Sequence, residues 1–92
     1  MEDFKDNAII KVVRFEQYPA EEPTSFAVGF TVNMKQNGKS IYRDAAVPFS
    51  LTKNKTDSEI VALAWADVKD GVISWYDANK TTSTIVGSLF MP

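Results

Sequence analysis

The pair Asn37-Gly38, set between two segments of alternating apolar residues, constrains the fold more than any other feature. Asparagine and glycine both tolerate the positive φ angles of a two-residue type I′ turn, so the pair predicts a tight β-hairpin over residues 24–49. Counting outward from that turn places Val32 opposite Arg43, and nearly all the apolar side chains then lie on one face. A slip of one residue would move one strand's apolar set to the other face, so turn and pattern favour the same pairing.

The opposite face of this hairpin carries small or polar side chains. A solvated outer face is the usual arrangement in an antiparallel sheet. The alternative is a flat surface on which another sheet or subunit packs closely. The candidate interaction surface consists of Ala27, Gly29, Thr31, Asn33, Asp44 and Ala46.

Residues 7–18 are rich in β-branched and aromatic side chains, which predicts a strand before the hairpin. Their alternation is imperfect, so either both faces of the strand are partly covered or a β-bulge shifts the phase. The segment from Pro19 to Pro23 suits a hairpin loop, because proline cannot donate to a strand ladder. The first three strands are therefore expected to form an antiparallel meander.

A change to helical periodicity follows the hairpin. Thr56 and Glu59 have the spacing of a capping box, which predicts a helix start. Measured at a helical angle, the apolar residues form one stripe: Val61, Ala64, Trp65, Val68, Val72, Trp75 and Tyr76. The stripe keeps its phase across Gly71, which favours one helix over 57–78 that ends near Asn79. The alternative is a helix that ends at Gly71, followed by a strand from residue 72.

Residues 82–91 are predicted to form a fourth strand, weakened by Gly87. The order β-β-β-α-β indicates an α+β fold: an antiparallel sheet of about four strands with one long helix packed on one face. The length of 92 residues predicts a single globular domain over residues 1–92.

The chain contains neither histidine nor cysteine, which removes the commonest general acid–base group, the thiolate nucleophile and the usual zinc ligands. The ten basic and twelve acidic residues include only two arginines, so a nucleic-acid partner is not expected. Asp67 and Asp70 are three apart on the predicted helix and could share a cation, but they fall on its polar side. We therefore expect no catalytic residue, no metal and no cofactor.

These observations favour a small non-catalytic interaction or assembly protein, such as a phage or viral accessory component. The expected partner is a second copy of the chain or another protein, and neither a membrane span nor a signal peptide is predicted. The expected location is cytoplasmic or virion-associated. The alternative function is a small-molecule or nucleic-acid binding module with a groove between helix and sheet, and with Trp75 or Tyr76 at its mouth.

Overall fold

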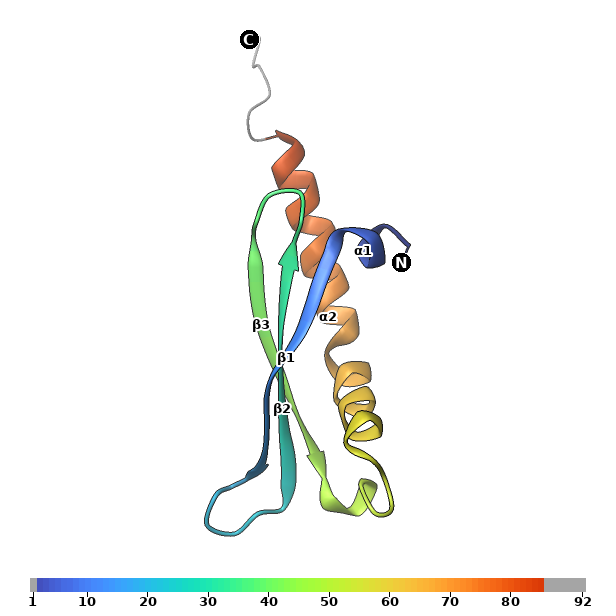
Figure 1. The fold of residues 1–92 in the computed structure, drawn as a ribbon. Coiled ribbons are helices and arrows are strands. Elements are labelled where there is room, and N and C mark those ends of the chain that lie inside the picture. Colours follow the sequence, from blue (N-terminus) through green and yellow to red (C-terminus); the bar gives the residue numbers. More distant parts are fainter. Residues whose placement is uncertain (1, 86–92) are drawn as a thin grey trace.

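The computed structural model of the chain describes residues 2–85, and the side chains of residues 3–80. Its elements are α1 (Glu2–Asn7), β1 (Ala8–Tyr18), β2 (Ser25–Met34), β3 (Ser40–Pro48), the short 3₁₀ helix η1 (Phe49–Leu51) and α2 (Asp57–Ile85) (Figure 1). The strands form one antiparallel sheet in the order β1-β2-β3, as the predicted meander requires. Because α2 covers one face of this sheet, the α+β class is confirmed, with three strands in the described part of the chain.

The capping box at the start of α2 forms as predicted. The Glu59 backbone N–H donates to Thr56 Oγ1 (3.2 Å), and the Thr56 N–H donates to Glu59 Oε1 (3.0 Å). These reciprocal bonds satisfy two of the backbone donors that a helix start leaves without intrahelical partners. The Thr56 N–H also lowers the pKa of the Glu59 carboxyl, because it stabilises the ionised form.

The helix α2 runs without a break through Gly71, which confirms the single-helix prediction. It continues beyond Asn79, its expected end, as far as Ile85. No further glycine or proline occurs between Asn79 and Gly87, and a β-branched residue costs a helix less than about 0.7 kcal/mol. The predicted fourth strand is therefore wrong for residues 82–85, which are helical, while its residues 86–91 lie outside the described residues.

The predicted hairpin register is wrong by two residues. Val32 pairs with Ile41, and Arg43 instead pairs with Phe30. The side-chain period of a strand is two, so this shift leaves every side chain on its predicted face. The apolar face is therefore as expected, although each side chain meets a different neighbour on the facing strand.

The hairpin loop explains the shift, because it contains four residues, 35–38, instead of two. The Met34 N–H donates to the Lys39 carbonyl (2.8 Å), and the Gly38 N–H donates to the Met34 carbonyl (3.0 Å). A type I′ turn needs positive φ at both central residues, but within Asn37-Gly38 only Gly38 has it, at +71°. Asparagine-glycine here ends a longer loop instead of forming the whole turn.

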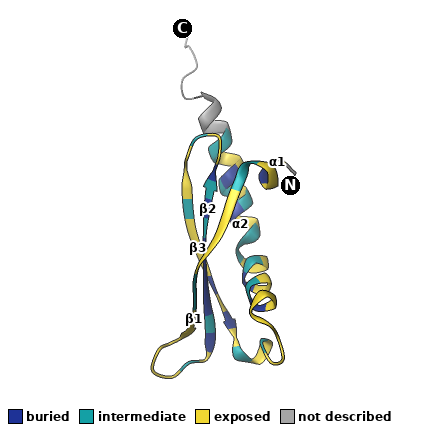
Figure 2. Ribbon diagram, viewed as in Figure 1, coloured by how far each residue is buried: buried dark blue, intermediate teal, exposed yellow. Residues whose placement is uncertain are grey.

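The core fills the space between α2 and the facing side of β2 and β3 (Figure 2). Its first cluster, near the start of α2, consists of Val28, Phe30, Ala45, Val47, Ile60 and Ala64. The second cluster, toward the hairpin loop, consists of Phe4, Val32, Met34, Val72 and Tyr76. The helical stripe thus faces the sheet as predicted. The same stripe predicts that Trp65 and Trp75 are mostly buried against the sheet, but the two side chains are only partly buried.

A β-bulge interrupts β1, as one of the two alternatives for its alternation predicted. Val12 pairs with Phe30 and Arg14 pairs with Gly29, so Val13 is the additional residue. The bulge reverses the phase of the strand. Even-numbered residues of β1 lie on the helix side of the sheet before the bulge, and odd-numbered residues lie there after it.

Candidate functional site

The six residues of the candidate interaction surface lie together on the outer face of the sheet, the face away from α2. Across β2 and β3, Ala27 pairs with Ala46 and Gly29 pairs with Asp44. Their exposure differs: Ala27 and Gly29 are buried, Thr31 and Asn33 are half-buried, and Asp44 and Ala46 are exposed. The sequence therefore grouped the residues correctly but did not show that other side chains cover two of them.

Tyr42 and Arg14 cover Gly29. A methyl group built on Gly29 would collide with the Tyr42 hydroxyl and would stand 2.9 Å from Arg14 Cβ and 2.9 Å from Tyr42 Cε1. A glycine inside a strand often marks such a close approach, which is the one signal the sequence carries. Tyr42 pairs with Thr31 instead of its predicted partner Asn33, which is two residues away on the same face, so the wrong register concealed this contact.

Arg14 is the centre of a charged group on the outer face. Its Nε donates to Glu16 Oε1 (2.7 Å), and its Nη1 lies 3.5 Å from Asp44 Oδ2. The Tyr42 hydroxyl donates to the same Asp44 oxygen (3.2 Å). The hydrogen bonds to Glu16 and then Tyr42 raise the pKa of the Arg14 guanidinium, which is therefore fixed as a cation.

A shallow hollow of about 260 Å³ opens beside this charged group. It is lined by Arg14, Tyr18, Ala27, Asp44, Ala45 and Ala46. The guanidinium carbon of Arg14 lies 5.8 Å from the centre of the Tyr18 ring, within the range of a cation–π contact. The hollow offers one cation, one carboxylate and an aromatic edge, which suits polar recognition, and no paired nucleophile and base.

The strand β1 carries a second surface, here named the β1 edge: Ile9, Ile10, Val12 and Val13. These four apolar side chains are between 41% and 52% exposed. β1 is an outermost strand of the sheet, and α2 packs over β2 and β3 instead (Figure 1). The β1 edge thus combines an open backbone with apolar side chains on both faces of the sheet, an arrangement that soluble proteins usually avoid.

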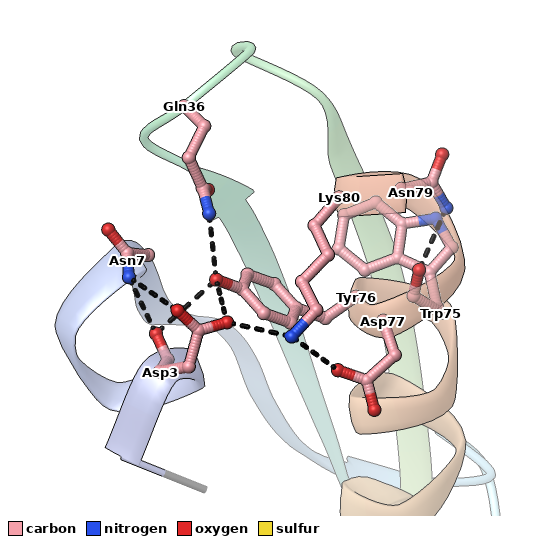
Figure 3. Close-up of polar contacts among 8 residues, drawn as sticks. All are labelled: Asp3, Asn7, Gln36, Trp75, Tyr76, Asp77, Asn79 and Lys80. Atoms are coloured by element: carbon pink, nitrogen blue, oxygen red, sulfur yellow. Dashed lines mark hydrogen bonds and ion pairs between the residues drawn. The ribbon is translucent and has the colours of Figure 1, made fainter. Parts of the chain in front are cut away.

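A polar network at the hairpin-loop end of the molecule joins α1, the hairpin loop and α2 (Figure 3). The hydroxyl of the fully buried Tyr76 accepts from Gln36 Nε2 (2.9 Å) and donates to Asp3 Oδ2 (3.0 Å). Lys80 Nζ binds the same carboxylate oxygen at 3.0 Å. The bond from Lys80, then that from Tyr76, lowers the pKa of Asp3, while Asp3 raises the pKa of Lys80.

This network secures the packing of the three elements. The alternative function places Trp75 or Tyr76 at the mouth of a groove. Tyr76 belongs to the core, whereas Trp75 is partly exposed. Among the described side chains, every buried polar atom has a hydrogen-bond partner. The network therefore presents no orphaned polar group to a ligand.

The remaining candidates are dispersed. Asp67 and Asp70 are exposed on α2, and the described residues contain no group of three side chains suited to hold a metal ion. Lys35 and Lys39 lie at the hairpin loop, whereas Lys53 and Lys55 precede α2 at the opposite end (Figure 1). No helix in the described range 2–85 is both long and apolar enough to cross a membrane.

Comparison of the chain with protein-family models, with curated proteins and with solved structures gives no match. The outer face of the sheet and the β1 edge are therefore the two surfaces on which we base the main functional proposal.

Proposed function

We propose that this chain is a non-catalytic interaction or assembly protein that binds a second copy of itself or another protein through the side and edge of the sheet that α2 leaves open. The observation that supports this most directly is the β1 edge, where four apolar side chains are about half exposed. Covering a side chain of this size completely contributes about 1.5–3 kcal/mol, so even partial coverage of four favours association. The open backbone donors and acceptors of β1 would gain partners in the same step.

The outer face extends this surface. Arg14, Glu16 and Asp44 place charges of both signs beside the small residues Ala27 and Ala46. Protein interfaces commonly have an apolar centre and a polar rim, and arginine and tyrosine are enriched in them. The charged group would orient a partner, while the apolar residues of β1 would supply most of the binding energy.

The test uses a photo-crosslinking amino acid at position 12, in β1, in the cells that make the protein. The matched control places it at position 62, where Ala62 is exposed on α2. We expect one discrete adduct from position 12, none from position 62, and loss of the adduct when Ile10→Lys is added. Equal labelling from both positions, or no adduct from position 12, would contradict the proposal.

The alternative function, ligand binding between helix and sheet, would use a different hollow. A space of about 400 Å³ lies where the sheet meets the start of α2, and its lining includes Phe26, Phe49, Lys53 and Lys55. The Asp57 carboxylate also lines this space, so two cations outweigh one anion, and aromatic rings beside this positive excess suit an anionic aromatic ligand such as a nucleotide. Titration of the chain with a nucleoside monophosphate, compared with Lys53→Glu, tests this alternative: saturable binding that the variant loses would support it, and its absence would exclude this ligand class.

A further inference from the structure

The bulge gives β1 a pattern of faces that a regular strand does not have. Before the bulge, Ile10 and Val12 pair with core residues of β2, so they lie on the helix side of the sheet. After it, Phe15 pairs with Val28 and also lies on the helix side. On the outer face, Lys11 precedes the bulge and Glu16 follows it, because they pair with Thr31 and Ala27.

We infer that the occupant of the β1 edge is a second copy of this chain, whose β1 pairs antiparallel with the first about a two-fold axis through the bulge. This inference rests on the proposed function and deepens it by naming the partner. In the pairing, Lys11 lies opposite Glu16 of the partner subunit, and two-fold symmetry repeats the contact. A strand that is charge-complementary to itself points to a second copy instead of an unrelated protein.

Face matching excludes most other registers. Residues directly opposite each other in an antiparallel pair share a face, so a slip of one residue would set helix-side residues against outer ones. A slip of two in one direction would set Lys11 against Arg14 of the partner subunit, two like charges. A slip of two in the other direction would set Arg14 against Phe15 of the partner subunit, on opposite faces. Only the pairing of Lys11 with Glu16 of the partner subunit satisfies faces and charges together.

The same register places aromatic rings against two of the four apolar residues of the β1 edge, whereas Ile10 lies opposite Gln17 of the partner subunit and Val13 lies opposite Arg14 of the partner subunit. Val12 lies opposite Phe15 of the partner subunit on the helix side, and Ile9 lies opposite Tyr18 of the partner subunit on the outer face. Pairs of aromatic and β-branched residues are favourable cross-strand neighbours. Arg14 does not block the charged contact, since both its short contacts are to Glu16 Oε1 and a carboxylate offers lone pairs on both oxygens.

The resulting dimer contains one continuous sheet of six strands, three from each subunit, with both copies of α2 on the same face. The outermost strands would then be the two copies of β3, which end at Pro48 and pack against α2. Proline and a covering helix are both ways in which proteins protect an edge strand. The pairing would thus cover the exposed edges of both β1 strands and leave only the protected edges of the two β3 strands.

The test is sedimentation equilibrium of Lys11→Glu and Glu16→Lys, alone, combined in one chain and mixed as separate chains. Each single reversal creates two like-charge contacts, so we expect a dimer dissociation constant about tenfold higher than that of the natural chain. The double reversal restores the opposite charges. A mixture of the two single variants also restores them, because one chain then carries acids at positions 11 and 16 and its partner carries lysines at both. Lys53→Glu, in the loop before α2, is the matched control and leaves association unchanged.

Circular dichroism would test whether each variant is folded. The mixture is an internal control, because it contains the same two chains as the single-variant samples. A natural chain that is monomeric up to about 500 µM would overturn the inference of a second copy, as would a dimer whose stability neither reversal changes. The proposed function is tested independently of this inference. A monomeric chain that still forms a crosslink from position 12 to another protein retains that function, whereas no crosslink at all removes it.

Discussion

Replacing Tyr76 by phenylalanine tests the polar network that fastens α1 and the hairpin loop to α2. Tyr76 is fully buried, and its ring packs edge-on against Phe4 with 5.3 Å between centroids. The substitution keeps the ring and removes only the hydroxyl, which bonds to Gln36 and Asp3. Each hydrogen bond contributes about 1 kcal/mol net, and both partners can rebind water, so we expect a loss of about 1–2 kcal/mol in the free energy of unfolding.

The measurement is chemical denaturation, with thermal melting as a second readout. For a domain of this size, 1 kcal/mol corresponds to about 4–8 °C in melting temperature, so Tyr76→Phe should melt roughly 4–16 °C lower. Tyr42→Phe is the matched control, because it also removes one tyrosine hydroxyl, from a ring that is 44% exposed on the outer face. That change should cost less than about 0.5 kcal/mol. Equal effects of the two substitutions would refute the assignment of Tyr76 as the junction of the three elements.

The same variant predicts a change in titration. The bonds from Lys80 and then Tyr76 hold the folded-state pKa of Asp3 below its ordinary value of 3.8. A lowered folded-state pKa stabilises the protein above the unfolded-state value, and the contribution is lost as pH falls through the folded-state value. We expect the pKa of Asp3 to rise toward 3.8 in Tyr76→Phe, as measured by NMR. An unchanged Asp3 titration would show that the hydroxyl does not bind the carboxylate.

Three further substitutions test the account of the fold. Gly71→Ala should stabilise the chain by about 0.5–1 kcal/mol in denaturation, because Gly71 is helical and an added methyl group meets nothing within 4 Å; a destabilised variant would contradict an unbroken α2. Thr56→Ala should cost about 1 kcal/mol, because the Glu59 N–H loses its acceptor, and should raise the pKa of Glu59, measured by NMR, because Glu59 Oε1 loses the bond from the Thr56 hydroxyl; an unchanged stability would contradict the capping role. Gly29→Ala should lower the melting temperature, because the methyl group would displace Tyr42; an unchanged melting temperature would show that Tyr42 does not pack on Gly29.

The faces of the hairpin could be predicted from the sequence, but its register could not. Alternation in β2 and β3 assigns each side chain to a face, and this assignment is insensitive to a shift of two residues. Only the loop distinguishes the two registers, and Asn37-Gly38 fits both a two-residue turn and the end of a four-residue loop. The contact between Tyr42 and Gly29 depends on the true register, so it was hidden as well.

The two ends of the chain show a different limit of the sequence. α1 is a short helix, which local propensity alone does not predict, and packing of Phe4 on Trp65 and Tyr76 accompanies it. At the other end, the apolar stripe of α2 has its last member at Tyr76, and the sequence predicts that the helix ends near Asn79. The backbone instead continues as helix to Ile85, since no residue there stops it. Exposure of the β1 edge was likewise hidden, because it depends on where α2 lies across the sheet.

Pairing of β1 with a second copy is tested most directly by cysteine crosslinking, which is clean here because the natural chain contains no cysteine. Chains carrying Lys11→Cys and chains carrying Glu16→Cys are mixed, oxidised mildly and analysed by mass. Opposite residues of an antiparallel pair are about 4.5–5.5 Å apart between Cα atoms, within the range of a disulfide. The account predicts that the mixed disulfide, with one cysteine at each position, forms far faster than either symmetric one. Equal rates for all three products, or faster symmetric ones, would contradict it.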